Sequence, residues 1–258
     1  MVLYQYIYMI KLDNYEFAYD PYPYAVIKNV FSEDDHKKII EEFPSHSKYF
    51  QDVVSKNKNE KKFLKKNFNN TKIQINNLNT FLAKSLIYSK FYNYISSNKF
   101  IEDIDIFLKY NHIDLRLSER INKKYFKFFK KKNINTYFEF SSISVDGGFI
   151  LPHTDSPKKI ITCIFSIIND ERINSYTGIE TDILTTNENK YKYNFYNKTV
   201  PKKNTQLVKK VPFESNQMMV FIKTHNSLHS VGPVFPKDNN LDRNFFRNTL
   251  TVCLEIEN

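Results

Sequence analysis

The residues best suited to chemistry are an imidazole and a carboxylate two positions apart, His153 and Asp155, at the end of the stretch Gly-Gly-Phe-Ile-Leu-Pro-His-Thr-Asp. On an extended backbone both side chains leave the same face, so they can bind one metal ion together. A second imidazole is available downstream, from His225 or His229. Two imidazoles and one carboxylate on one triangular face, with open positions opposite, form the ligand set of iron centres that bind oxygen.

Composition restricts the class of protein. With 258 residues the chain is long enough to bury a core, and we expect one domain over residues 1–258. Hydrophobic residues at 41% exclude a disordered chain, and 4 glycines argue against repeats and Gly-rich phosphate loops. The net charge of +10 is attributed to a solvated surface rather than to a nucleic-acid footprint, so nucleic acid is not the expected partner.

Two further features bear on the compartment. Cys163 and Cys253 lie in apolar, strand-like runs, where a free thiol behaves as a small buried hydrophobe. Together with an N-terminus that lacks a basic region and a cleavage site, this favours a reduced, cytoplasmic protein. No apolar run reaches about 18 residues, so no membrane span is expected.

The N-terminal half, residues 1–134, is expected to supply strands, supporting helices and a flap. Ser32 is the predicted cap of a helix that Pro44 ends. The polar segment 44–79 is too long for an ordinary connection and is either a mobile flap or a poorly ordered loop. The remaining predictions are a strand at 24–27, an amphipathic helix at 79–96, an extended segment at 103–117 and a basic stretch at 119–133.

The C-terminal half, residues 135–258, has the pattern of about six to eight short strands separated by turns. The clearest runs are 136–144, 160–168, 176–184, 217–222 and 249–256. A polar excursion, 185–210, interrupts them. This pattern predicts an α+β protein whose core is a double-sheet jelly roll.

Taken together, these segments resemble the Fe(II)- and 2-oxoglutarate-dependent dioxygenases, closest to the prolyl-hydroxylase-like branch. The segments that carry the resemblance are 147–155, 160–168, 226–231 and 247–250. The resemblance implies a distorted double-stranded β-helix of cupin-like type that binds Fe(II) through His153, Asp155 and His229. It also implies that Arg247 binds the far carboxylate of 2-oxoglutarate, that O2 is consumed, and that ascorbate is a candidate reductant.

Each of these assignments has a competitor. His229 is favoured over His225 because of its Asn-Ser-Leu-His-Ser-Val context and the Gly-Pro turn that follows, and His225 is interpreted as a rim residue. Arg247 is favoured over Arg243 because it directly precedes an alternating strand, where a guanidinium that grips a carboxylate with two hydrogen bonds is well anchored. The remaining histidines His36, His46 and His112 are interpreted as surface residues without partners.

Other residues are candidates around the cavity. Tyr137 and Thr162 are predicted to contact the co-substrate, and Ser166 to face the cavity. Lys158 and Lys159 either contact an acidic substrate or face water. The sequence departs from the family in two respects: the lysine that classical prolyl hydroxylases often use for the co-substrate has no clear counterpart, and a usual glycine pair is reduced to one glycine, at position 178.

The expected reaction is oxidative decarboxylation of 2-oxoglutarate to succinate and CO2, coupled to hydroxylation of a small-molecule or peptidyl, prolyl-like substrate. The alternatives are a non-catalytic jelly-roll binding module and a nucleic-acid demethylase, the latter suggested by the interleaved lysines and aromatics of 123–129. The loops 44–79 and 185–210 are expected to set the substrate, and they carry no recognisable code. The oligomeric state is not encoded in any motif.

Overall fold

The computed structural model describes residues 9–53, 65–121, 134–238 and 240–256. It combines helices with antiparallel sheets, and every strand pairing is antiparallel. The large sheet has the order β1-β2-β11-β7-β14-β5-β4-β3, the second sheet β10-β9-β12-β6, and the third β13-β8.

The bounds of the strands follow the chain. In the large sheet they are β1 (Tyr15–Ala18), β2 (Tyr24–Lys28), β3 (Gln51–Asp52), β4 (Lys65–Asn69), β5 (Ile134–Ser144), β7 (Lys159–Ile167), β11 (Gln217–Ile222) and β14 (Phe246–Ile256). In the smaller sheets they are β6 (Ile150–His153), β8 (Tyr176–Thr177), β9 (Thr181–Thr185), β10 (Gln206–Val211), β12 (His229–Val231) and β13 (Phe235–Pro236).

The centre of the large sheet is built on β5 and β14, which pair along their whole length from Phe246 opposite Ser144 to Ile256 opposite Ile134. Side chains alternate between the two faces of each strand. One face carries large apolar side chains that form the main hydrophobic core with the helices. The five predicted strand runs all coincide with strands, although 176–184 contains two short ones.

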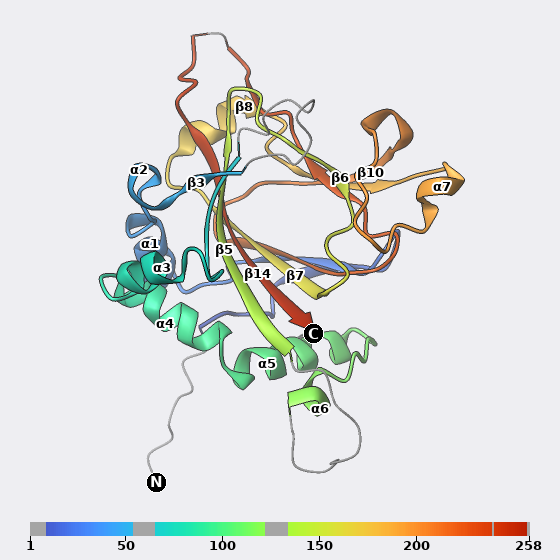
Figure 1. Cartoon of the computed structure of the whole chain (residues 1–258), viewed down its shortest axis with the longest axis horizontal. Coiled ribbons are helices and arrows are strands. Elements are labelled where there is room, and N and C mark those ends of the chain that lie inside the picture. Colours follow the sequence, from blue (N-terminus) through green and yellow to red (C-terminus); the bar gives the residue numbers. More distant parts are fainter. Residues whose placement is uncertain (1–8, 54–64, 122–133, 239, 257–258) are drawn as a thin grey trace.

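Helices cover this apolar face, as Figure 1 shows. They are α1 (Glu33–Glu41), α2 (His46–Tyr49), α3 (Ile75–Leu82), α4 (Leu86–Ile95), α5 (Asn98–Tyr110) and α6 (Leu117–Ile121). The predicted cap of α1 is confirmed, because the hydroxyl of Ser32 accepts a hydrogen bond from the backbone N–H of Asp35. None of the described helices is long and apolar enough to cross a membrane.

The prediction of a single helix over 79–96 is wrong in its bounds. The structure has two helices, α3 and α4, with a break at residues 83–85. Ser85 causes the break, because its hydroxyl accepts a hydrogen bond from the N–H of Tyr88 and so caps the second helix.

The prediction of an extended segment at 103–117 is also wrong. Helix α5 covers most of it, and the buried residues Phe100, Ile104, Phe107 and Leu108 recur at helical spacing. The predicted window began inside this helix and so missed its first turn. Beyond α5, the carboxylate of Asp105 accepts hydrogen bonds from the first backbone groups of α6, which supports a compact turn instead of a strand.

The two polar segments predicted to be loops contain regular structure. Within 44–79, the helices α2 and α3 and the strands β3 and β4 are described, and β4 pairs with β5. Residues 54–64 of this segment and the basic stretch 122–133 lie outside the described residues. The excursion 185–210 contains the short helix α7 (Asn189–Lys192) and most of β10.

The second sheet lies across from the other face of the large sheet. Ile183 of β9 packs in one cluster with Val26, Met219 and Phe221, which come from β2 and β11. In Figure 1, β6, β10 and α7 lie on the side away from α3, α4 and α5. The space between the two sheets therefore receives the second, more polar set of side chains from the large sheet.

Candidate metal centre

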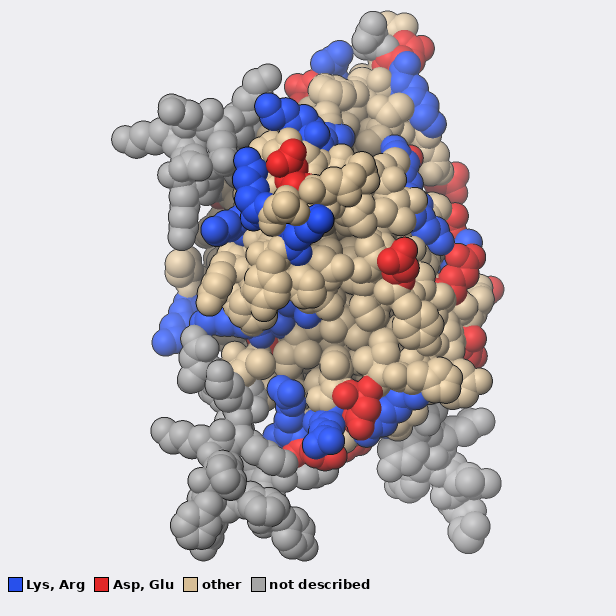
Figure 2. Space-filling model, turned by 90° about the vertical axis from the view of Figure 1, so that its right-hand side faces the viewer, with Lys and Arg blue, Asp and Glu red and all other residues tan. Residues whose placement is uncertain are grey.

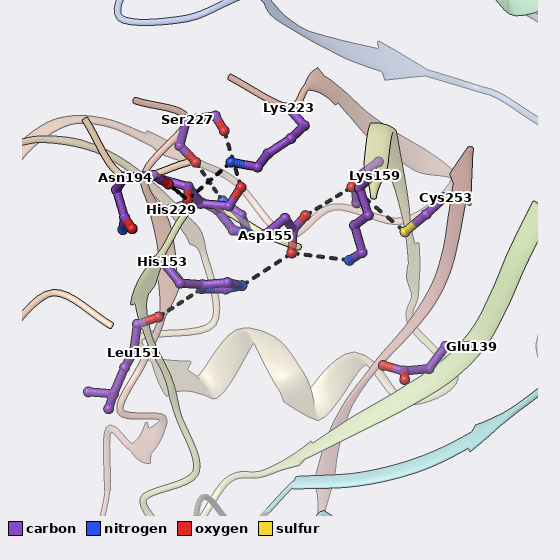
Figure 3. Close-up of polar contacts among 12 residues, drawn as sticks. Glu139, Leu151, His153, Asp155, Lys159, Asn194, Lys223, Ser227, His229 and Cys253 are labelled. Carbon is purple, nitrogen blue, oxygen red and sulfur yellow. Dashed lines mark hydrogen bonds and ion pairs between the residues drawn. The ribbon is translucent and has the colours of Figure 1, made fainter. Parts of the chain in front are cut away.

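The candidate ligands come from two neighbouring strands of the second sheet. His153 ends β6 and lies directly opposite His229, the first residue of β12, with the ring centroids 4.3 Å apart. Asp155 follows β6 in a left-handed conformation with φ of 70°. One ligand atom from each of these three residues lies within 4.8 Å of the other two. Strand alternation therefore does not place Asp155 beside His153, as the sequence had suggested; a turn in the backbone does (Figure 3).

Both imidazoles are held in one tautomer. Nδ1 of His153 lies 2.9 Å from the carbonyl of Leu151, and Nδ1 of His229 lies 3.0 Å from the carbonyl of Ser227. A carbonyl only accepts hydrogen bonds, so each Nδ1 donates and each Nε2 keeps its lone pair. Burial, with a contribution from His153, lowers the pKa of His229 to about 3, so this ring is neutral at neutral pH. Both rings are thus prepared to bind a metal ion.

The carboxylate of Asp155 is fixed by two donors. Thr162 donates to its Oδ2 at 2.9 Å and Lys159 to its Oδ1 at 3.1 Å. Burial alone would raise the pKa of Asp155, but Lys159 and the two imidazoles outweigh that effect and hold the pKa well below its usual value. Two neutral nitrogens and one charged oxygen fit a divalent iron centre that keeps open coordination positions.

A buried guanidinium lies deeper between the sheets. Arg247 on β14 is 3% exposed, and it donates to the carbonyl of Ile179 at 2.5 Å and to the hydroxyl of Thr181 at 3.3 Å. Its Cζ lies 4.2 Å from the ring centroid of Phe213. Burial lowers the pKa of Arg247 to about 9, so the group remains charged at neutral pH.

No carboxylate of the described residues forms an ion pair with Arg247; its hydrogen-bond partners there are neutral. Burying a cation without an anion costs free energy, and a bound carboxylate would offset that cost. Thr181 pairs with Val231, whereas Ile183 pairs with His229. The guanidinium therefore lies about two residues from His229 along the second sheet, or roughly 7 Å, a separation that a five-carbon dicarboxylate can span.

The structure separates the other predicted co-substrate residues from Arg247. Thr162, Cys253 and Tyr137 form one row across β7, β14 and β5, level with Asp155. Arg247 pairs with Ile143, six residues or roughly 20 Å along β5 from Tyr137. Thr162 and Tyr137 thus lie near the metal ligands and not beside the guanidinium.

The hydroxyl of Tyr137 donates to Oε2 of Glu139 at 2.5 Å. The predicted cavity residue Ser166 is buried two rows further along β7, opposite Thr249. Glu139 itself was missed by the sequence analysis. Its carboxylate also accepts from Lys65 at 3.0 Å and from Asn67 at 3.2 Å.

A signal for Glu139 exists in the sequence, because it stands between two phenylalanines in a strand whose alternate positions are apolar. A carboxylate at such a position is buried on the opposite face of the strand and must find partners there. Lys159, which was expected to meet substrate or water, is instead largely buried against Asp155. In Figure 3, Glu139 lies across from Asp155.

The competing residues are placed elsewhere. His225 is exposed and stacks on Tyr193, with ring centroids 4.8 Å apart. Arg243 is exposed and donates to Asp146 at 2.8 Å. The prediction that His46 has no partner is wrong.

His46 is half-buried on the helix-covered side of the large sheet. Its Nε2 lies 2.8 Å from the hydroxyl of Ser142 and 3.1 Å from Oδ1 of Asn248, and its ring stacks on Phe246. These partners come from β5 and β14, far from His46 in sequence, so local context could not reveal them.

A pocket of about 190 Å³ opens beside the metal ligands. The residues that line it are Val53, Lys65, Phe149, Ile150, Leu151, His153, Asn197 and Thr199. It therefore joins the edge of the large sheet, the strand that carries His153 and the loop that follows α7. A small group or a side chain that entered it would approach the metal centre.

The chain was compared with known proteins. No protein-family model matches it, and no curated protein sequence matches it. Solved structures that are similar include a prolyl hydroxylase from Trichoplax adhaerens in complex with a hypoxia inducible factor oxygen degradation domain peptide fragment, at 12% identity and a TM-score of 0.45, covering 90% of this chain and 83% of that chain.

A prolyl 4-hydroxylase from Phytophthora capsici has 15% identity and a TM-score of 0.47, and the match covers 90% of this chain and 58% of that chain. A prolyl-4-hydroxylase from Pseudomonas putida has 11% identity and a TM-score of 0.45, covering 91% and 92%. These three structures are prolyl hydroxylases, the branch that the sequence resembles.

Proposed function

We propose that this chain is an Fe(II)- and 2-oxoglutarate-dependent dioxygenase that hydroxylates a small molecule or a peptidyl substrate. In this proposal residues 1–258 form one oxygenase domain with a distorted double-stranded β-helix at its core. The observation that carries the proposal is the pairing of two sites. A triad of His153, Asp155 and His229, with both free Nε2 atoms available, lies roughly 7 Å along one sheet from a buried guanidinium that lacks an anion.

Each residue has a role in the proposed reaction. His153, Asp155 and His229 hold Fe(II), and Arg247 binds the far carboxylate of 2-oxoglutarate through parallel hydrogen bonds. Thr162 keeps the carboxylate of Asp155 in its orientation. When bound, iron and 2-oxoglutarate supply the oxidative chemistry, which consumes O2, releases succinate and CO2 and leaves a hydroxyl group on the substrate.

The protein contributes binding and exclusion of water. The apolar residues Phe149, Ile150 and Leu151 line the pocket beside His153 and limit the access of solvent. The positive charge of Arg247 is fully present before the co-substrate arrives, so binding replaces an uncompensated buried charge with an ion pair. Ascorbate is proposed as an auxiliary reductant.

The test measures succinate formed from 2-oxoglutarate under air with added Fe(II), in the absence of any primary substrate. We expect slow turnover in the wild type, loss of turnover in His153→Ala and in Arg247→Ala, and wild-type turnover in the matched control Arg243→Ala, whose side chain is exposed. The absence of turnover, together with the absence of an anaerobic absorbance band from iron-bound 2-oxoglutarate, would contradict the proposal and favour a non-catalytic binding module.

A further inference from the structure

The segment 187–204, between β9 and β10, presents large aromatic side chains to solvent. Tyr193 is 73% exposed, Tyr196 76% and Phe195 38%. Exposed aromatics that gather within four residues are more typical of a binding surface than of an inert one. Figure 2 shows the side of the molecule on which α7 lies in Figure 1, where basic side chains gather around a broad uncharged area and most acidic ones lie toward one edge.

This segment is fastened to the backbone on both sides of a candidate metal ligand. The hydroxyl of Thr154 donates to the carbonyl of Asn194 at 2.5 Å, and the N–H of Val200 donates to the carbonyl of Pro152 at 2.9 Å. Pro152 and Thr154 flank His153. The aromatic side chains therefore have a defined position relative to the metal centre.

A buried asparagine shapes the intervening turn. Asn194 is 3% exposed, and its side chain accepts from the N–H of Lys198 at 2.8 Å and donates to the carbonyl of the same residue at 2.6 Å. The loop closed by these bonds contains Phe195, Tyr196 and Asn197, and the last of these lines the pocket beside His153. The exposed aromatics and the pocket are thus parts of one continuous surface.

The charge of this surface is strongly biased. Between residues 187 and 204 the acidic residue is Glu188, whereas the exposed lysines are Lys190, Lys192, Lys198, Lys202 and Lys203. Lys223 adds a further cation, with its ammonium 5.2 Å from the ring centroid of Phe195. Such a surface attracts acidic groups, and its aromatic side chains supply contact area at low cost in conformational entropy.

The pocket indicates which acidic macromolecule fits. Its volume of about 190 Å³ suits an amino-acid side chain, and its lining contains one aromatic residue, Phe149. Enzymes that act on a nucleobase hold the extruded base between stacking side chains, and this lining offers no aromatic pair. The observations therefore favour a polypeptide over a nucleic acid.

We propose that the surface formed by residues 190–198, here termed the tyrosine-lysine surface, binds an acidic stretch of a polypeptide substrate. Tyr193 and Tyr196 pack against the peptide, and Lys190, Lys192 and Lys198 attract its carboxylates. A neighbouring side chain of the same peptide then enters the pocket beside His153. The designation of the peptide as a substrate rests on the function proposed above, whereas its binding does not.

The test measures fluorescence anisotropy of a short fluorescein-labelled peptide in which Glu alternates with Pro and Ala, at low salt and without iron. The comparison probes are the same peptide with Lys in place of Glu and an oligothymidylate of similar length. The variants are Tyr193→Ala/Tyr196→Ala and Lys190→Gln/Lys192→Gln. The matched controls are Tyr110→Ala on α5, where the side chain is 78% exposed, and Lys37→Gln on α1.

We expect the acidic peptide to bind more tightly than either other probe, and each double variant to weaken that binding by about fivefold or more, as the loss of two exposed contacts implies. The two controls are expected to retain wild-type affinity. Equal binding of the Lys peptide, tighter binding of the oligothymidylate, or unchanged binding in both double variants would each overturn the proposal. Because no iron is present, these outcomes are independent of the succinate measurement.

Discussion

The two faces of the large sheet use the same strands for different purposes. Toward the helices, Phe138, Phe140 and Phe165 are completely buried in an apolar core. On the opposite face, Glu139 and Arg247 are also buried, at 8% and 3% exposure, but they are charged. Degree of burial therefore does not distinguish a residue that stabilises the fold from a residue that can bind a ligand.

What distinguishes the two faces is how polar groups are satisfied. The apolar face gains free energy in proportion to the area it removes from water. The polar face must provide a partner for each buried group, and it does so for Glu139 through Lys65, Asn67 and Tyr137. Arg247 has neutral partners only, and that deficit suggests a missing carboxylate. The following predictions test this division, in order of expected effect.

The largest effect is expected on the apolar face. Phe140→Ala removes a completely buried ring that contacts the rings of Phe68, Tyr88 and Phe138. We expect the free energy of unfolding, measured by urea denaturation, to fall by about 3–5 kcal/mol. Affinity for Co(II), measured by absorbance under conditions where the variant is folded, should be unchanged. A loss of stability below about 1 kcal/mol would show that the core rearranges to fill the space.

On the polar face, Arg247→Met should separate binding from stability. We expect the affinity for 2-oxoglutarate in the presence of Co(II), measured by calorimetry, to fall by at least about 30-fold, because a buried carboxylate loses its cation. The free energy of unfolding without ligand should not decrease, since an uncompensated buried charge is removed. Arg243→Met is the exposed control and should change neither quantity. A large loss of stability in Arg247→Met would indicate that the guanidinium is a structural element.

The pH dependence of stability should also belong to the polar face. The pKa of His229 is about 3 in the folded protein against 6.5 for an ordinary histidine, so the unfolded state binds more protons between these values. Stability from this residue is complete above pH 6.5 and is lost as the pH falls toward 3, by up to about 1.4 kcal/mol per pH unit.

The measurement is urea denaturation of the metal-free protein at a series of pH values. His229→Gln should show a smaller slope of stability against pH than the wild type over this range. Phe140→Ala should keep the wild-type slope while being less stable throughout. An identical slope in wild type and His229→Gln would contradict the neutral, buried state assigned to this imidazole.

The smallest effect is expected at a residue that supports a metal ligand. Thr162→Val keeps the shape of the side chain but removes the hydroxyl that donates to Asp155. We expect the affinity for Co(II) to fall by about tenfold, as is typical when a group that orients a ligand is lost. Thr249→Val, on the same face of the neighbouring strand, is the control and should leave metal affinity unchanged. Equal effects in both variants would mean that Thr162 acts on the sheet and not on Asp155.

Much of the fold could be predicted from local patterns. The alternation in 136–144 and the apolar run in 160–168 coincide with β5 and β7, because side-chain alternation is a property of the strand itself. The helix α5 was missed because the window considered began after its first turn. The pairing of Glu139 with Lys65, and that of His46 with Ser142 and Asn248, depended on contacts between segments far apart in the chain.

For the candidate site, the sequence by itself determined the chemistry of the donors: two imidazoles, a carboxylate and a guanidinium, whose types and order already suggested an iron centre with an acidic co-substrate. The tertiary structure decided their arrangement. Pairing of β6 with β12 sets His229 opposite His153, and the left-handed turn at Asp155 brings the carboxylate to them. These positions follow from the free energy of sheet pairing and packing over the whole chain, which no short stretch of residues specifies.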